Sequence, residues 1–545
     1  MTSRSLRFRA PLLWLVLPLM AGLAAGRLGA LAPPRALLTA AAMAAVLTLL
    51  AGWRAQRIFW LPLVTAMLLI GMATQALHER RLPEWDTLPP REARLTLRLD
   101  RVFASPFDDR ANGLATVTAA EPHLRDLVGQ RMYFSFATRA GDPPPVRSAV
   151  VSVVGVIAAV PRDPPADTFE SYLVNAGLNF RLSRGRELAV EQPASAYQVF
   201  CARLAERMNA LLTRGLENRP EIAAVYRAMM LGQKHELSEE QHQLFMHSGT
   251  MHLFAINGLH IGVVALSLHF LLALLRCPRV AASLLVLAVL WLDVDTTGAS
   301  PSAVRAFIMV AMLESAWALR RPVNPLAALA AAALLALMLD PPDFFSASFQ
   351  MSHCVVLAIL LFGLPLAERL RARWPALRDV PEATWTRRQR VRAWLWRRFL
   401  DTLGIGCAAT LVSVVTGVQF FSVFVTGALL ANLVLVPLAS VVIMAGFASL
   451  MLGLAGAGWA GRLCNEGAGA LLRLIDALIR LGTSVPGSSW AAHFRADWVG
   501  PAALVTLVAA LLAGYAGGWR KEYGGFWPPV AVVAFTLILG VKFGS

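Results

Sequence analysis

The chain has 545 residues, of which 57% are hydrophobic and only 15% are charged. A soluble protein of this length could not bury so much apolar surface, so the composition excludes a soluble globular protein and indicates a polytopic membrane protein. The net charge of +16, from 50 basic and 34 acidic residues, fits either a nucleic-acid partner or the basic cytoplasmic loops of an inner-membrane protein. The net charge alone favours the second explanation, basic cytoplasmic loops.

Three apolar runs open the chain, at 11–31, 36–53 and 58–77. Each is long enough to cross a bilayer. The first run follows several arginines and so imitates a secretory signal peptide, but the two runs directly behind it favour an uncleaved span. We therefore expect residues 1–78 to form an N-terminal transmembrane region.

Residues 79–193 have a different pattern, in which apolar and polar residues alternate from Ala93 to Leu99 as in a half-buried strand. Fifteen arginines, no lysine and fifteen acidic residues leave this segment without net charge (15 − 15 = 0), so it is not a general electrostatic trap for a polyanion. About five short strands predict a small β-barrel, and an OB-fold is the natural candidate. The further β-type runs lie at 114–119, 131–137, 149–160 and 178–183.

The rest of the chain is again rich in apolar runs. A partly polar helical connector at 194–248 leads into a membrane domain at 249–460, which carries a basic loop at 369–402. An amphipathic helix and loop at 461–498 is expected on the outer membrane surface, before the last spans at 499–545. With the first three runs, 12 to 13 spans are predicted. The expected spans here are 250–275, 280–296, 302–319, 324–340, 351–367, 403–420, 424–437 and 438–456 (divided at Pro437), 499–516 and 527–543.

The arginines predict the orientation, because basic loops stay in the cytoplasm. Ten arginines lie within 369–398, which is therefore expected inside. With a cytoplasmic N-terminus, the barrel at 79–193 and the C-terminus both lie outside.

Two histidines and an asparagine interrupt the first span of the membrane domain, where Gly249–Ala265 reads GTMHLFAINGLHIGVVA. Polar groups at membrane depth are costly and usually functional. The segment resembles the signature of the ComEC family of competence proteins, approximately H-L-L-A-I-S-G-L-H-I-G, with Asn257 in place of the serine. Three later segments are similar to other patterns of that family: Thr297–Ala306, Phe349–Ser352 and Asn432–Leu438.

The resemblance implies an inner-membrane channel that takes up single-stranded DNA during natural transformation, with an extracytoplasmic OB-like domain. Many members also carry a metallo-β-lactamase-like nuclease domain with an H-x-H-x-D-H cluster, which this sequence lacks, so we expect a transport protein and no enzyme. No GxxxxGK[ST] nucleotide-binding loop is present either. The implied partners are single-stranded DNA, the lipid bilayer, a separate nuclease, a periplasmic DNA receptor and a cytoplasmic helicase motor, and a homodimer is an open alternative.

The candidate DNA pathway consists of polar or small residues in these segments, with Arg305 placed to attract phosphates. Each residue has a structural alternative, such as buried hydrogen bonding for the histidines, helix packing for Gly258, or an ion pair for Arg305. We expect no catalytic residue, metal or cofactor. The pathway candidates are His252, Asn257, Gly258, His260, Ser300, Ser302, Arg305, Gln350, Ser352 and Asn432; the weaker barrel candidates for DNA contact are Arg131, Tyr133 and Phe134.

Other functions stay open at this point. The same scaffold could carry another solute, since a fold does not fix its cargo. An intramembrane enzyme using His252 and His260 would need a nearby carboxylate or nucleophile, and none is evident in the sequence. A non-functional remnant is the third alternative.

Overall fold

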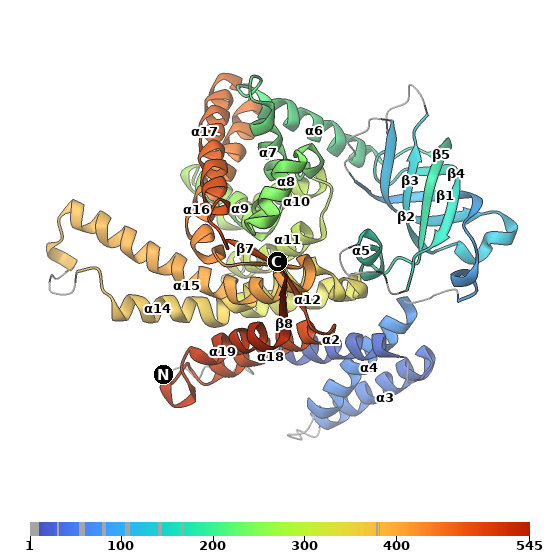
Figure 1. Ribbon diagram of the computed structural model, residues 1–545, viewed down its shortest axis with the longest axis horizontal. Helices are drawn as coiled ribbons and strands as arrows, with labels where there is room; N and C mark the ends of the chain where they lie inside the picture. Colours follow the sequence, from blue (N-terminus) through green and yellow to red (C-terminus); the bar gives the residue numbers. More distant parts are fainter. Residues whose placement is uncertain are drawn as a thin grey trace.

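The computed structural model is mostly helical and has one closed β-barrel at its edge (Figure 1). The predicted class, a polytopic helical membrane protein with a small inserted barrel, is confirmed. The structure describes residues 10–29, 32–53, 60–78, 83–103, 109–139, 144–162, 164, 168–254, 256–377, 380 and 382–544.

The barrel closes through five strands in the order β1-β2-β3-β5-β4, and β1 pairs with β4. All strand pairs are antiparallel except β3 with β5. A short helix, α5 (Phe169–Asn175), precedes β5. The strands are β1 (Arg91–Phe103), β2 (Arg110–Ala120), β3 (Arg131–Ala137), β4 (Val150–Ala159) and β5 (Phe180–Gln192).

The alternating pattern seen in the sequence builds the barrel interior. Leu95, Leu97 and Leu99 of β1 are at most 1% exposed, because every second side chain of a strand points to the same face. Phe134 and Phe136 of β3 are fully buried beside them and stack on each other. The barrel therefore has its own apolar core.

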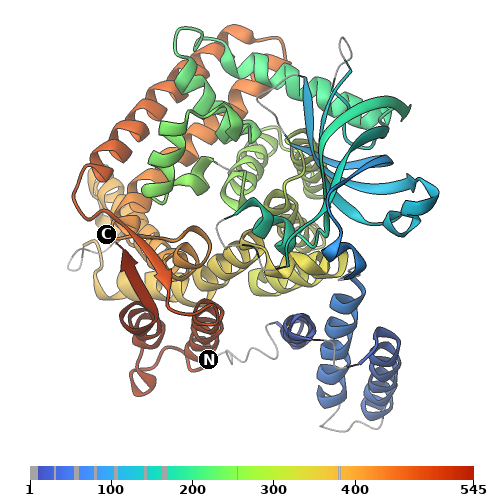
Figure 2. The same ribbon diagram turned by 45° about the vertical axis from the view of Figure 1, so that its right-hand side comes forward.

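The N-terminal helices are α2 (Leu13–Leu28), α3 (Pro34–Trp53) and α4 (Trp60–His78), which lie below the barrel in Figure 2. Glycines let α2 and α4 approach closely. A Cβ added at Gly22 would lie 2.0 Å from the carbonyl oxygen of Leu68, and one at Gly71 would lie 2.4 Å from that of Leu19. Small residues at such contacts are typical of packed membrane helices.

The connector and the membrane domain follow as a series of helices. The connector holds α6 (Ala196–Thr213), α7 (Pro220–Leu231) and α8 (Glu239–His247), and the membrane domain opens with the short turn η4 (Met251–Phe254). The membrane domain holds α9 (Gly258–Leu274), α10 (Arg279–Thr296), α11 (Pro301–Ala318), α12 (Pro325–Leu339), η5 (Pro341–Phe345), α13 (Ala347–Ala358), η6 (Ile359–Gly363), α14 (Leu364–Arg373), α15 (Arg387–Phe421) and α16 (Ala428–Leu454).

The last part holds α17 (Gly458–Thr483), α18 (Val499–Ala516), α19 (Trp527–Phe535) and η9 (Thr536–Gly540). A small antiparallel sheet joins three distant segments of the chain. Its strands are β6 (Val423–Val425), β7 (Ser489–Phe494) and β8 (Val541–Gly544), paired in the order β6-β7-β8.

Within the described residues, six helical segments are long and apolar enough to cross a membrane, and four shorter apolar helices accompany them. The six are Pro34–Trp53, Trp60–His78, Ala347–Arg373, Arg387–Phe421, Ala428–Leu454 and Val499–Ala516. The number of 12 to 13 spans stays a prediction, because several helices at predicted spans are short or carry buried charges.

Two local predictions were wrong. The run at 424–456 is not divided at Pro437: α16 continues through it, and membrane helices tolerate such a lost hydrogen bond when neighbouring groups re-satisfy the backbone. The helical part of the final span ends at Gly540, where β8 begins by pairing with β7. The cytoplasmic location of the basic loop at 369–402 stays a prediction; the structure shows that the end of α14 and the start of α15 make a helical hairpin there.

The amphipathic helix α17 buries its apolar side against the protein. Leu472, Ile475 and Ile479 are at most 2% exposed and belong to one core with residues of α7 and α16. Its polar Asn465 is also fully buried, and its Nδ2 donates to backbone carbonyls of Leu211 and Arg214. Whether the opposite, polar side of α17 faces the outer membrane surface stays a prediction.

Candidate functional site

The start of α9 is built around Asn257. Its Oδ1 accepts hydrogen bonds from the backbone N–H groups of Leu259 (2.9 Å) and His260 (3.3 Å). Its Nδ2 donates to the carbonyl oxygen of His252 at 2.5 Å. Asn257 is thus the N-cap of α9, a position where asparagine and serine are both favoured. The predicted span 250–275 therefore begins as a helix only at Gly258.

The two signature histidines lie in different surroundings. His252 belongs to the turn before α9, is exposed, and has its Nδ1 3.0 Å from the carbonyl oxygen of Gly249. His260 lies in the first turn of α9, is 2% exposed, and has no hydrogen-bond partner for either ring nitrogen within the described residues. No hydrogen bond joins the two histidine rings within the described residues.

Gly258 and Gly262 form an open strip along α9. Both are exposed, and a Cβ added at either would meet nothing within 4 Å. Within the described residues no other helix packs on Gly258 or Gly262. The strip presents bare helix backbone on the same face as exposed Leu266.

Arg305 is the centre of a polar cluster between α11 and the η5–α13 segment. It is 3% exposed; Nη1 donates to Asp343 Oδ2 at 2.7 Å and Nη2 donates to Ser348 Oγ at 2.5 Å. Ser346 caps α13 and donates to the second oxygen of Asp343 at 2.7 Å. The guanidinium is therefore neutralised and enclosed, so it cannot attract phosphates without breaking this pair. Its role in this structure is to join two segments.

The other pathway candidates divide into helix caps and partly exposed groups. Ser300 caps α11 by accepting a hydrogen bond from the backbone of Ala303. Gln350 donates to the carbonyl oxygen of Phe344 at 3.2 Å. Ser302, Ser352 and Asn432 are partly exposed.

The three barrel candidates are engaged within the protein. Phe134 lies in the barrel core, so its predicted contact with DNA is wrong. Tyr133 packs edge-on against Phe169 with ring centroids 4.9 Å apart, and burial raises the pKa of its phenol. Arg131 Nη1 pairs with Asp340 Oδ1 at 3.2 Å, which ties β3 to the end of α12.

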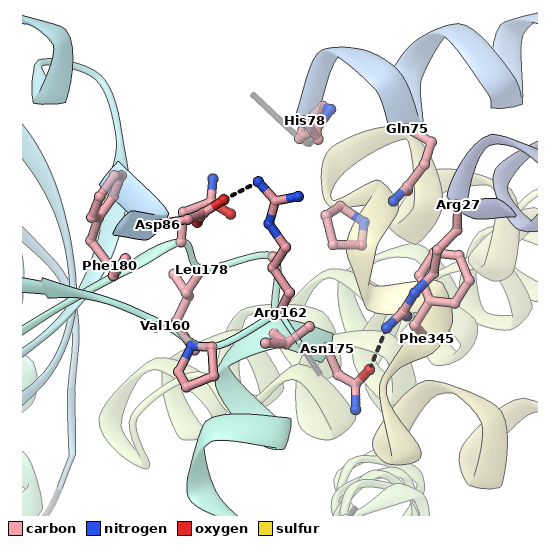
Figure 3. Close-up of a pocket in the computed structure, with 16 residues that line it drawn as sticks. Arg27, Gln75, His78, Asp86, Val160, Arg162, Asn175, Leu178, Phe180 and Phe345 are labelled. Atoms are coloured by element: carbon pink, nitrogen blue, oxygen red, sulfur yellow. Dashed lines mark hydrogen bonds and ion pairs between the residues drawn. The ribbon is translucent and has the colours of Figure 1, made fainter. Parts of the chain in front are cut away.

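Two more arginines fasten the barrel region to the membrane helices. Arg147 pairs with the nearly buried Asp295 of α10 at 2.7 Å. Arg27 at the end of α2 donates to Asn175 Oδ1 at 3.2 Å and lies over the ring of Phe345. Figure 3 shows this second contact at the edge of a pocket between the barrel and the ends of α2 and α4. The barrel is therefore held at several points.

One buried polar group was missed by the sequence reasoning. Glu314 of α11 is 8% exposed; His269 Nε2 of α9 lies 2.6 Å from its Oε1, and Ser283 of α10 donates to its Oε2 at 2.9 Å. The rule that polar groups at membrane depth find partners would have suggested this group, but it does not say which residues meet. Within the described residues, no group of three or more histidine, cysteine, aspartate or glutamate side chains could hold a metal ion.

Comparison with known proteins gives a family and one relative. The model of the family described as "Competence protein" matches residues 229–520. A relative named ComE operon protein 3, from Bacillus subtilis (strain 168), is 30% identical over 142 residues, which are 26% of this chain and 18% of the relative. The match thus spans less than a fifth of the relative's length. No solved structure matches the chain significantly.

Proposed function

Because this chain belongs to the competence protein family, we propose that it takes part in DNA uptake during transformation, as the inner-membrane channel that passes single-stranded DNA. The observation that carries the proposal is the position of the signature within the matched residues. The matched part begins in α7 and includes the capped start of α9 with its open glycine strip.

The arrangement of charge supports a conducting role more than a binding role. The buried Arg305 is neutralised by Asp343, and the pathway candidates that are partly exposed are uncharged. A polyanion that must keep moving is retarded by strong cationic sites, whereas uncharged polar groups and bare backbone hold it weakly. His260 is buried without a hydrogen-bond partner in the described residues and points about 200° around α9 from Gly258, so it lies on the opposite face from the strip.

The proposed partners follow from what the sequence does not carry. No nucleotide-binding loop motif is present, so we propose a separate cytoplasmic motor that pulls the strand. A separate nuclease and a periplasmic DNA receptor would supply the strand. The orientation, with the N-terminus in the cytoplasm and the barrel outside, is part of the proposal.

A deletion strain of a competent host tests the function. Loss of this gene should abolish transformation while fluorescent DNA still binds at the cell surface, and a plasmid copy should restore transformation. A deletion strain that transforms at the wild-type frequency would contradict the proposal, and it would favour a transporter of another solute on the same scaffold.

A further inference from the structure

The hairpin formed by the end of α14 and the start of α15 extends away from the rest of the molecule, on the opposite side from the barrel (Figure 1). It carries many of the chain's arginines. Segment 364–402 has ten arginines and four acidic residues, so its net charge is 10 − 4 = +6. The barrel, by contrast, has no net charge.

The geometry of α15 keeps this hairpin off the membrane surface. α15 is one helix of 35 residues without proline, about 52 Å long at 1.5 Å per residue. Its apolar part, 403–421, has the length needed to cross a bilayer core of about 30 Å. The preceding residues, 387–402, therefore continue the axis of the span for about 24 Å into water. A continuous helix cannot bend there to lie flat.

One face of the hairpin carries exposed aromatic rings between arginines. Trp374, Trp396 and Phe399 are 52%, 39% and 42% exposed, and the rings of Trp396 and Phe399 stack with centroids 5.5 Å apart. Trp396 Nε1 donates to the carbonyl oxygen of Trp374 at 2.9 Å, which fixes the two helices. Arg373, Trp374, Arg392 and Trp396 line one hollow, and Phe399 stacks on Trp396 beside it; we call these five residues the hairpin groove.

Within the described residues, no acidic side chain neutralises the arginines of the groove. Elsewhere in the hairpin, Arg371 pairs with Asp401 and Arg397 pairs with Glu382. Arg373 and Arg392 are exposed and form no ion pair within the part of the chain that the structure describes. The groove therefore combines available cations with large apolar rings, which fits a polyanion that also presents flat rings.

We propose that the hairpin groove binds single-stranded DNA as it leaves the membrane on the cytoplasmic side, an inference that rests on the proposed function. Unpaired bases stack on exposed aromatic rings, and arginines hold the intervening phosphates. A duplex hides its bases, so it binds this surface only through phosphates. A strand held at this place is retained until a motor engages it.

The test uses the purified full chain in lipid nanodiscs and a fluorescein-labelled oligothymidylate, with binding followed by anisotropy. Trp374→Ala removes an exposed ring while keeping the backbone carbonyl that Trp396 uses. Trp394→Ala is the matched control, since Trp394 is 56% exposed but points about 200° around α15 from Trp396. We expect Trp374→Ala and Phe399→Ala each to weaken binding about tenfold or more, and Trp394→Ala to leave it nearly unchanged.

A second pair of variants tests the charges. Arg373→Gln with Arg392→Gln should lower the slope of log Kd against log salt concentration by about 1.4, because each lost phosphate contact on a single strand removes about 0.7. Arg387→Gln with Arg398→Gln, on the side of Trp394, should change the slope less. Unfolding temperatures of all variants should match that of the wild type, because every substituted side chain is exposed.

Three results would overturn the proposal. Groove variants that bind the oligonucleotide like the wild type would show that the groove is not the site. Equal losses in the groove and control variants would reduce it to non-specific attraction. A bimane label on Trp374→Cys, in a chain without the five native cysteines, that is quenched by brominated lipids would show that the groove lies on the bilayer. These results are independent of the deletion test, which judges uptake and not this surface.

Discussion

At the scale of single residues, buried charge is what organises the membrane helices. Arg305 is almost completely enclosed, and Asp343 and Ser348 satisfy its two terminal nitrogens. Removing one partner of a buried pair leaves the other charge uncompensated, which costs far more than losing an exposed pair. Arg305, which the sequence suggested as a residue that attracts phosphates, thus has a structural role in this protein: it joins two segments through an ion pair.

Asp343→Asn should therefore destabilise the protein strongly, by about 3 to 5 kcal/mol, because Arg305 stays buried without its anion. Asp340→Asn is the control: its pair with Arg131 is about 40% exposed on both sides, so its loss should cost about 1 kcal/mol or less. Thermal unfolding in detergent measures both variants. Equal unfolding temperatures for the two would contradict the enclosed pair.

Glu314 gives a second prediction at this scale. Glu314→Ala removes the acceptor for His269 and Ser283 and should cost about 1 to 3 kcal/mol, since each interhelical hydrogen bond in a membrane is worth about 0.6 to 2 kcal/mol. Glu314→Gln keeps one acceptor oxygen and should therefore destabilise the protein less than Glu314→Ala does. If both variants unfold like the wild type, the three helices are not held by this group.

At the scale of elements, α9 depends on its cap and on the absence of side chains along one strip. The signature asparagine does the work that a serine does in the family's pattern, because both side chains accept from the first backbone N–H groups of a helix. The two glycines of this helix face open space, whereas Gly22 and Gly71 face backbone. The same residue type therefore has two different roles in this chain.

Asn257→Ser should retain transformation near the wild-type frequency, because serine preserves the cap. Asn257→Ala should loosen the helix start by about 1 kcal/mol and lower transformation. The frequency of transformants at matched protein levels is the measurement. A wild-type frequency for the alanine variant would show that the cap is dispensable.

Gly262→Leu separates the two roles of glycine. Because its surroundings are open, this variant should insert and unfold like the wild type but block DNA passage if the strip lines the pathway. Gly71→Leu should instead destabilise the protein, since its Cβ would lie 2.4 Å from the Leu19 carbonyl oxygen. Normal transformation by a stable Gly262→Leu variant would place the pathway elsewhere.

At the scale of the whole molecule, the barrel and the basic hairpin lie at opposite sides of the helical part (Figure 1). Arg131, Arg147 and Arg27 hold the barrel region against the membrane helices through Asp340, Asp295 and Asn175. This separation fits a chain whose barrel and basic segment lie on opposite sides of a membrane, and the arginine rule predicts that the basic segment is the cytoplasmic one.

Cysteine labelling tests that orientation. In a background without the five native cysteines, His123→Cys on the barrel should react with a membrane-impermeant maleimide added to spheroplasts, because His123 is exposed. Arg388→Cys in the hairpin should react only after the membrane is opened. The reverse pattern would show an inverted topology.

The sequence by itself determined the membrane class, the barrel and the signature, because apolar run length, two-residue alternation and a motif are local properties. The limit of the sequence is seen in β3. Alternation placed Arg131, Tyr133 and Phe134 on a strand, but only the closed barrel decided that Phe134 lies in the core and that Arg131 pairs with Asp340. The Arg305–Asp343 pair and the Glu314 group join residues 31 or more positions apart. Such contacts depend on which helices are neighbours, and hydrophobicity along the chain does not carry that information.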